Sequence, residues 1–398
     1  MAHSSATLKA LPTRIDRYPA KMIAHLAKRL IGLYASDADH VLDPFCGSGA
    51  VLQAALAHNL RSTGVDINPF GVLLSGVKVE GFDKKRALDL CDDVLLAAHR
   101  GEEFPIKWEA KEYWFTPATI RKFEQIRMAA KARDLASSKA GRAVLLALGL
   151  SVRLCSRADQ RSPKPFISKY ARERRKGHHY DPAVVMRGLI GELCELYSGR
   201  RHTQGRVVRC DVTASGGIAG LDGECSHIVT SPPYINAQDY FRNSKLELYL
   251  LEGLLPFCVS ELKNDFIGSE RGLTSTVLHD EDSDDRRRRV PQLSYLERNC
   301  PGQAVIVHAY LHSMKTAFHG MRRALRSTGS LVIVCGDNLI GGKRILTWKI
   351  LNQMLEDIGF ELFDSFEDTI RNRAVAPRRS GHKGLIKQEV VSAFRVGR

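Results

Sequence analysis

His40-Val-Leu-Asp-Pro-Phe-Cys-Gly-Ser-Gly49 is a short apolar strand that runs directly into a turn containing two glycines. Residues 50–58 (AVLQAALAH) have the composition of a helix that follows the turn. Residues 61–67 (RSTGVDI) predict a second short strand that ends in Asp66, and another helix is expected after Pro69. A strand, a glycine turn, a helix and a second strand in this order are typical of the start of a doubly wound α/β sheet.

The rest of the chain alternates between regular elements at helical and strand spacing. A helix is expected at 19–34, ahead of the first strand. Four further helices are predicted at about 83–98, 117–133, 139–155 and 182–198. Strands then return at 206–210, 226–230, 330–335, 360–366 and 388–396, with helices near 242–252, 302–325 and 345–357.

This order predicts one α/β sheet that is split by a mainly helical insertion. Residues 1–80 and 206–398 form the expected sheet domain, and residues 81–205 form the expected insertion. Within the irregular stretch 256–301, the run DEDSDDRRRR is expected to be a solvated or disordered loop.

The net charge of +15 is concentrated in one part of the chain. Residues 121–206 carry 20 Lys and Arg against 7 Asp and Glu, which leaves a surplus of 13 positive charges. Such a local surplus is typical of a surface that meets a polyanion, and nucleic acid is the commonest one. A solvated helical face with a basic loop would have the same composition.

Several classes of protein are disfavoured by composition. With 44% hydrophobic residues the chain can form a sizeable core, but it has no apolar run of membrane-spanning length and no apolar leader at its start. The nine cysteines are scattered without a C-x-x-C pair, so we expect reduced thiols and a cytoplasmic protein rather than disulfides or a zinc site. No metal site is predicted.

The glycine turn has the properties of a site for an adenosine cofactor. Glycines let the backbone turn tightly beside a ligand, and the first N–H groups of the next helix face that ligand. Asp66 is placed to accept hydrogen bonds from ribose hydroxyls. A nicotinamide dehydrogenase is disfavoured, because its fingerprint G-x-G-x-x-G/A would need Gly or Ala where Leu52 stands.

The sequence D-P-F-x-G-S-G, followed by G-V-D-I-N-P at residues 64–69, resembles motifs I and II of the DNA amino-methyltransferases. The resemblance covers roughly residues 15–80 and 206–398, and it implies a class I methyltransferase (Rossmann-like) fold with a mostly parallel seven-stranded sheet. It also implies S-adenosylmethionine as the cofactor. Arg17-Tyr-Pro-Ala-Lys-Met22 is similar to motif X, which lines the same site in that family. The implied cofactor-binding residues are Tyr18, Pro19, Lys21, Asp43, Phe45, Gly47, Gly49, Asp66, Asn68 and Asp211.

Thr230-Ser-Pro-Pro-Tyr234 follows an apolar strand and predicts the catalytic loop. The amino group of a base is a poor nucleophile, and acceptors such as Ser231 Oγ and the Pro232 carbonyl can draw its nitrogen towards tetrahedral geometry. Tandem prolines stiffen the loop and carry no N–H. Tyr234 would stack on a base swung out of the duplex, which is worth about 1–3 kcal/mol. The predicted catalytic residues are Ser231, Pro232, Pro233 and Tyr234.

The target base is left between alternatives. Serine in the first position of S-P-P-Y is typical of cytosine-N4 enzymes, whereas Asp or Asn there is typical of adenine-N6 enzymes. A tRNA guanine-N2 methyltransferase shares the D-P-F-x-G-S-G turn, but it usually has D-P-P-Y and an N-terminal RNA-binding domain. A DNA-binding module with a degenerate methyltransferase fold is the non-enzymatic alternative.

The expected partner is double-stranded DNA, and a cognate restriction endonuclease would be a further partner in a prokaryotic or phage-encoded restriction-modification system. The basic insertion is the preferred target-recognition region, and residues 256–301 are a second candidate. The predicted nucleic-acid contacts are Arg157, Arg161, Lys164, Lys169, Arg172, Arg174, Arg175 and Lys176. No oligomeric state is predicted.

Overall fold

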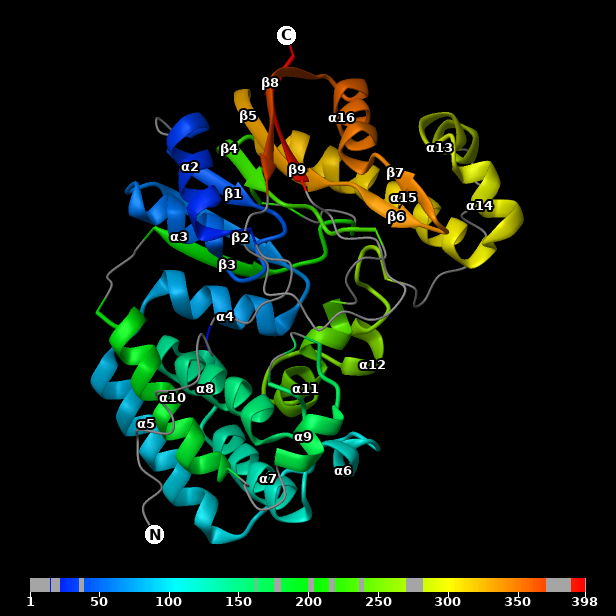
Figure 1. Cartoon of the computed structure of the whole chain (residues 1–398). Coiled ribbons are helices and arrows are strands. Elements are labelled where there is room, and N and C mark those ends of the chain that lie inside the picture. The colour runs from blue at the N-terminus through cyan, green and yellow to red at the C-terminus, as the bar shows by residue number, and fades with distance from the viewer. Residues whose placement is uncertain are drawn as a thin grey trace. The chain divides into compact units, whose positions relative to one another are not determined.

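The structure is a computed structural model, and it describes residues 15, 22–35, 39–160, 162, 164–174, 180–199, 204–214, 218, 220–235, 240–269, 282–369 and 388–397. The chain forms two compact units (Figure 1). The sheet unit comprises residues 20–68, 204–240 and 261–398, and the helical unit comprises residues 1–19, 69–203 and 241–260.

A seven-stranded sheet in the order β3-β2-β1-β4-β5-β9-β8 forms the centre of the sheet unit. Its strands are β1 (His40–Asp43), β2 (Arg61–Asp66), β3 (Gly205–Arg209), β4 (Cys225–Thr230), β5 (Leu325–Gly336), β8 (Phe360–Thr369) and β9 (Gln388–Val396). Neighbours from β3 to β5 pair in parallel, and β9 is antiparallel to both β5 and β8. The predicted α/β fold with a mostly parallel seven-stranded sheet is confirmed.

Helices cover both faces of this sheet because neighbouring strand residues point to opposite sides. Val41 and Val229 pack in a cluster with α2 (Ala24–Tyr34) and α3 (Ala50–Ala57). Leu42 and Ile228, their neighbours in sequence, pack in a second cluster with α15 (Pro301–Ala324) and α16 (Thr347–Asp357).

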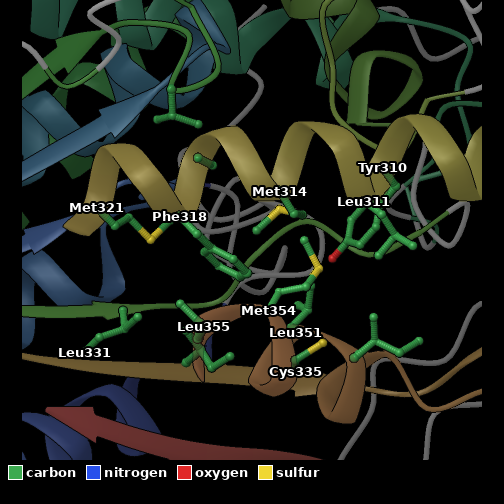
Figure 2. Close-up of a cluster of buried hydrophobic side chains, with 14 of the residues drawn as sticks. Tyr310, Leu311, Met314, Phe318, Met321, Leu331, Cys335, Leu351, Met354 and Leu355 are labelled. Atoms are coloured by element: carbon green, nitrogen blue, oxygen red, sulfur yellow. The ribbon is translucent and has the colours of Figure 1, made fainter. Parts of the chain in front are cut away.

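The second cluster is shown in Figure 2. Met314 and Phe318 of α15 point towards Leu351 and Leu355 of α16, and Leu331 of β5 lies to the left of Leu355 in the same layer. All five side chains are buried. Each such side chain contributes about 1.5–3 kcal/mol by leaving water. This layer holds α15 and α16 on one face of the sheet.

One expectation about the sheet unit is wrong. Ser283–Arg289, part of the run expected to be a solvated or disordered loop, forms helix α13. Its carboxylates precede its guanidinium groups by one helical turn, so that Asp284 pairs with Arg287 at 2.7 Å and Asp285 with Arg289 at 2.6 Å. Pairs at this spacing stabilise a helix. A run of acidic and basic residues at this spacing therefore favours a helix as much as it favours a solvated loop.

Four more elements were not predicted. Helix α14 (Leu293–Asn299) follows α13, and a two-stranded sheet forms from β6 (Asn338–Ile340) and β7 (Lys343–Ile345). The turn between β6 and β7 has positive φ at Gly341 and Gly342. Helix α12 (Val259–Leu262) is one short turn.

The main helices of the helical unit are α4 (Pro69–Glu80), α5 (Lys84–Ala97), α7 (Pro117–Ala132), α8 (Lys139–Cys155), α10 (Pro182–Tyr197) and most of α11 (Tyr240–Leu251). Shorter pieces are α6 (Lys111–Trp114), α9 (Lys169–Arg174) and 3₁₀ turns at Ala98–Arg100 and Leu135–Ser137. The helices predicted in residues 81–205 all form.

Side-chain caps set where these helices begin. Thr116 accepts a hydrogen bond from the N–H of Thr119, Ser138 from Gly141 and Asp181 from Ala183. Such caps satisfy N–H groups that have no partner within the helix. Pro117 and Pro182 occupy first-turn positions, where the missing N–H costs nothing.

Helix α4 and residues 241–260 pack with the helical unit, whereas the sequence division placed both with the sheet domain. Both segments approach α8 closely at Gly149. A Cβ added there would lie 3.2 Å from Leu251 of α11 and 3.3 Å from Phe70 of α4. Among the residues that the structure describes, no helix is both long and apolar enough to cross a membrane.

Candidate active site

The predicted site residues follow three adjacent strands of the sheet unit. β1 ends at Asp43, β2 at Asp66 and β4 at Thr230, and β1 pairs in parallel with both neighbours. The carboxyl ends of parallel strands meet at one edge of a sheet, which is where ligands bind in open α/β folds. The cofactor turn and the catalytic loop therefore leave the sheet at the same edge.

The cofactor turn depends on three glycines. Gly47 and Gly49 have positive φ, and Gly49 is the N-cap of α3. Gly64 lies beneath the turn on β2, where a Cβ would lie 2.5 Å from Leu52 and 2.9 Å from Cys46 Sγ. Leu52 is the residue that departs from the dinucleotide fingerprint, and its side chain packs against Gly64 on the neighbouring strand. Gly64 begins the second motif, but its place beneath the turn was not predicted.

Asp66 is held by the turn that it faces. Its Oδ2 accepts the N–H of Gly47 at 2.8 Å, and its Oδ1 accepts the N–H of Asn68 at 2.8 Å. Burial raises the pKa of Asp66 to about 6, against these two hydrogen bonds, which lower it. Each carboxylate oxygen can accept more than one hydrogen bond. The carboxylate is therefore oriented and can still receive hydroxyl donors.

Asp43 connects the cofactor turn with the catalytic loop. Its side chain is 3% exposed, and its Oδ1 accepts hydrogen bonds from Thr230 Oγ1 at 2.7 Å and from the N–H of Phe45 at 3.2 Å. Burial raises the pKa of Asp43 to about 7. The contact of Asp43 with a cofactor stays a prediction. Its hydrogen bond with Thr230 is present in the structure.

The catalytic loop is held at its far end by residues from other elements. Tyr234 is 6% exposed, and its hydroxyl donates to Glu389 Oε1 of β9. The N–H of Tyr234 donates to the hydroxyl of Tyr240 at 3.3 Å. Burial, with Glu389 beside it, raises the pKa of Tyr234 well above its usual value. Ser231 is half-buried.

Two further residues secure the loop after Tyr234. Asn338 Nδ2 donates to the carbonyl of Ile235 at 2.9 Å, and Asn338 Oδ1 accepts the hydroxyl of Thr347 at 2.8 Å. A Cβ on Gly268 would lie 2.7 Å from the carbonyl oxygen of Tyr234. Glu389 and Gly268 belong to none of the predicted motifs, so neither residue was expected at the site.

The other predicted cofactor residues are placed as follows. Asp211 comes after β3, and its Oδ1 accepts the N–H and the hydroxyl of Thr213 at 2.8 and 2.7 Å. The N–H of Cys210 donates to the carbonyl of Asp66 at 3.2 Å, which brings this turn beside β2. Phe45 is half-buried in the cofactor turn. Tyr18, Pro19 and Lys21 lie outside the described residues.

The predicted nucleic-acid contacts belong to the helical unit. Arg157 Nη1 donates to the carbonyls of Glu112 and Tyr113 at 2.6 and 3.2 Å, so this group holds the segment around α6. Lys169 and Arg172 of α9 are exposed, and Lys164 is half-buried. Arg174 ends α9, and Arg161, Arg175 and Lys176 lie outside the described residues.

Residues 2–74 match a family model for N6/N4 methyltransferases, described as DNA methylase. This match relates the chain to the N4/N6 amino-methyltransferases. The sheet order is that of their class I fold, and S-adenosylmethionine is the methyl donor that the family and the fold imply. The glycine turn with its oriented Asp66 carboxylate fits an adenosine cofactor.

Three type II methyltransferases are similar in sequence to this chain. Type II methyltransferase M.MjaII of Methanocaldococcus jannaschii is 31% identical over 81 residues, which are 20% of this chain and 15% of that protein. M.MvaI of Kocuria varians is 42% identical over 73 residues, 18% of this chain and 16% of its own. M.AvaI of Nostoc sp. is 22% identical over 386 residues and covers 87% of this chain and 78% of its own. The first two matches thus span about a sixth of those relatives.

Proposed function

We propose that the protein transfers the methyl group of S-adenosylmethionine to the exocyclic amine of a flipped base in double-stranded DNA, with cytosine N4 as the favoured target. The hydrogen bond between Thr230 and Asp43 carries the proposal, because it joins the cofactor turn to the catalytic loop at one edge of the sheet. Neither motif alone would support methyl transfer to a base.

The residues of the chain would act on the amine in two ways. Ser231 Oγ and the carbonyl of Pro232 would accept its N–H groups, so that the nitrogen lone pair leaves conjugation with the ring and can form the new N–C bond as the S–C bond of the cofactor breaks. The proton that the amine loses would pass to these acceptors and from them to solvent. The bound cofactor supplies an electrophilic methyl group. Alignment of the amine with that methyl group accounts for most of the remaining acceleration. Tyr234 is 6% exposed, so its ring would have to be uncovered before it could stack on the base, and the stacking role stays a prediction.

The choice of cytosine N4 rests on the serine at position 231, and adenine N6 is the second candidate. Expression in a methylation-free host, followed by single-molecule sequencing of the genomic DNA, reports the base and its sequence context together. N4-methylcytosine is the expected product. N6-methyladenine would overturn the choice of base, and N2-methylguanine in RNA would overturn the choice of substrate.

The catalytic roles are tested by Ser231→Ala and Tyr234→Ala. Both should abolish tritium transfer from labelled cofactor to DNA while the cofactor dissociation constant stays within about threefold, because neither residue belongs to the cofactor turn. Ser365→Ala on β8, which loses a hydroxyl bonded to the Val391 carbonyl, is the matched control and should keep full activity. Transfer that survives both changes contradicts the assignment.

The proposed DNA contact is tested by neutralising Lys164, Lys169 and Arg172. The slope of log K against log salt should become less negative by about 0.9 for each lost phosphate contact. Neutralisation of Lys84 and Arg187 is the control, because these cations are paired with Glu195 and Asp92 in the same unit. An unchanged slope in the first variant would exclude α9 and its loop as the phosphate contact.

A further inference from the structure

Glu389 lies at the edge of the sheet where the proposed chemistry takes place. β9 runs antiparallel to β5, so the first residues of β9 lie opposite the last residues of β5, and Glu389 pairs with Gly336. β5 in turn pairs in parallel with β4, which ends at Thr230. A carboxylate more than 150 residues further along the chain thus reaches the catalytic loop from a strand that carries no recognised motif.

The contact of Glu389 with Tyr234 joins the hydroxyl of a buried residue to a half-buried carboxyl group. The Tyr234 hydroxyl donates to Glu389 Oε1, and the ring of Tyr234 is almost wholly buried. A hydrogen bond to an ionised acceptor is stronger than a neutral one, and removing one partner inside a protein leaves the other unsatisfied. The contact therefore restrains where Tyr234 lies.

Restraint at Tyr234 acts on the residues just before it. Thr230 is bonded to Asp43 at the start of the loop, and Tyr234 is bonded to Glu389 at its end. Between these anchors lie Ser231, Pro232 and Pro233, and the φ angles of the two prolines are restricted. A stiff segment of three residues between two fixed ends can present its Ser231 hydroxyl and Pro232 carbonyl in few arrangements.

We propose that Glu389 is a positioning residue, which acts through the Tyr234 hydroxyl to place Ser231 Oγ and the Pro232 carbonyl against the target amine. This inference rests on the proposed function. It differs from a purely structural role, because loss of the contact should slow the chemical step more than it weakens cofactor binding or folding.

A second tyrosine–carboxylate pair in the same unit provides a matched control. Tyr34 at the end of α2 donates its hydroxyl to Asp364 of β8 at 2.6 Å, in an exposed setting. The pair has the same chemistry, but it holds no residue of the catalytic loop. Tyr34→Phe and Asp364→Ala should therefore leave kcat within about twofold of the wild type.

The test combines Tyr234→Phe, Glu389→Ala, Glu389→Gln and the double variant Tyr234→Phe/Glu389→Ala. For each variant kcat, the DNA KM, the cofactor dissociation constant and the melting temperature are measured. We expect Glu389→Ala to lower kcat about 10- to 100-fold, the size of effect that a misplaced reacting group produces, with cofactor affinity within about threefold. Glu389→Gln, which keeps an acceptor, should recover most of the rate, and the double variant should be no slower than either single variant.

Three outcomes would overturn the inference. The first is an unchanged kcat in Glu389→Ala. The second is a double variant whose loss of kcat equals the product of the two single losses. The third is a loss of kcat in Glu389→Ala that matches the fraction of this variant that is unfolded at the assay temperature. If Glu389→Ala does not fold, Tyr234→Phe and Glu389→Gln decide the question. A normal kcat in Tyr234→Phe would by itself contradict the inference. If the wild type methylates no DNA, the proposed function is wrong. If the wild type is active and Glu389→Ala leaves kcat unchanged, only this inference is wrong.

Discussion

The carboxyl groups at the ends of β1 and β2 differ from those around α13, although both sets belong to the sheet unit. Asp43 and Asp66 are surrounded by backbone N–H groups and hydroxyls, and burial raises their pKa values to about 7 and about 6. Asp282, next to α13, accepts a hydrogen bond from Lys315 at 2.7 Å, and this contact lowers its pKa. Asp43 and Asp66 are thus strained towards protonation, whereas Asp282 is stabilised as the anion.

This difference separates residues kept for chemistry from residues kept for the fold. A buried carboxylate without a cation destabilises the ionised protein, so its retention at a strand end is typical of a functional site. An exposed ion pair contributes little, with typical values below about 1 kcal/mol. The strand-end carboxylates should therefore dominate ligand binding and pH dependence, and the α13 carboxylates should affect neither.

The largest effect is expected for Asp66→Ala, measured as cofactor affinity by calorimetry. Loss of an oriented charged acceptor should weaken S-adenosylmethionine binding about 10- to 100-fold, since hydrogen bonds to charged groups contribute about 1.5–3 kcal/mol. Asp282→Ala, the matched change beside α13, should leave affinity within twofold. Equal losses in the two variants would remove the distinction between the regions.

The second effect concerns the pH dependence of stability. Because the pKa of Asp43 is raised in the folded state, the folded protein binds this proton more tightly, and stability falls as pH rises from the unfolded value towards about 7. Asp43→Asn removes this dependence. Its free energy of unfolding relative to the wild type should therefore rise by about 2 kcal/mol between pH 5 and pH 8.

Asp282→Asn is the control for this experiment, and its sign is opposite. A lowered pKa in the folded state gives stability that is present above the unfolded pKa and is lost only as pH falls below it. The cost of Asp282→Asn should thus stay constant between pH 5 and pH 8. If the free energy of unfolding of Asp43→Asn relative to the wild type stays constant or falls between pH 5 and pH 8, ionisation of Asp43 does not destabilise the folded protein.

The smallest effect is expected for Thr230→Val, an isosteric change that removes the hydroxyl bonded to Asp43. Urea unfolding should show a loss of about 1–2 kcal/mol, since a buried acceptor loses one of its donors. Thr316→Val on α15, where the hydroxyl donates to the His312 carbonyl in an exposed setting, should cost less than about 0.5 kcal/mol. Comparable losses at both positions would mean that the link between turn and loop contributes nothing special.

Much of the fold follows from patterns that extend over a few residues. The helices at 117–132, 139–155 and 182–197 begin at Thr116, Ser138 and Asp181, whose side chains cap them. The strand, glycine turn and helix around Gly47 are equally local. The α13 error has the same origin, because charges at a spacing of three or four residues support a helix as readily as they favour solvent.

Short-range patterns in the chain were sufficient to predict most of the elements, the α/β class and the two motifs that meet at the edge of the sheet, and the resemblance to the amino-methyltransferases implied that the sheet is mostly parallel. Only the folded chain could reveal that Glu389 reaches Tyr234, that Gly64 makes room for Leu52 and that Gly268 fits beneath the Tyr234 carbonyl. These contacts depend on the register between β5 and β9 and on the approach of segments far apart in the chain. Such geometry is set by the packing of the whole core, and no local pattern of residues encodes it.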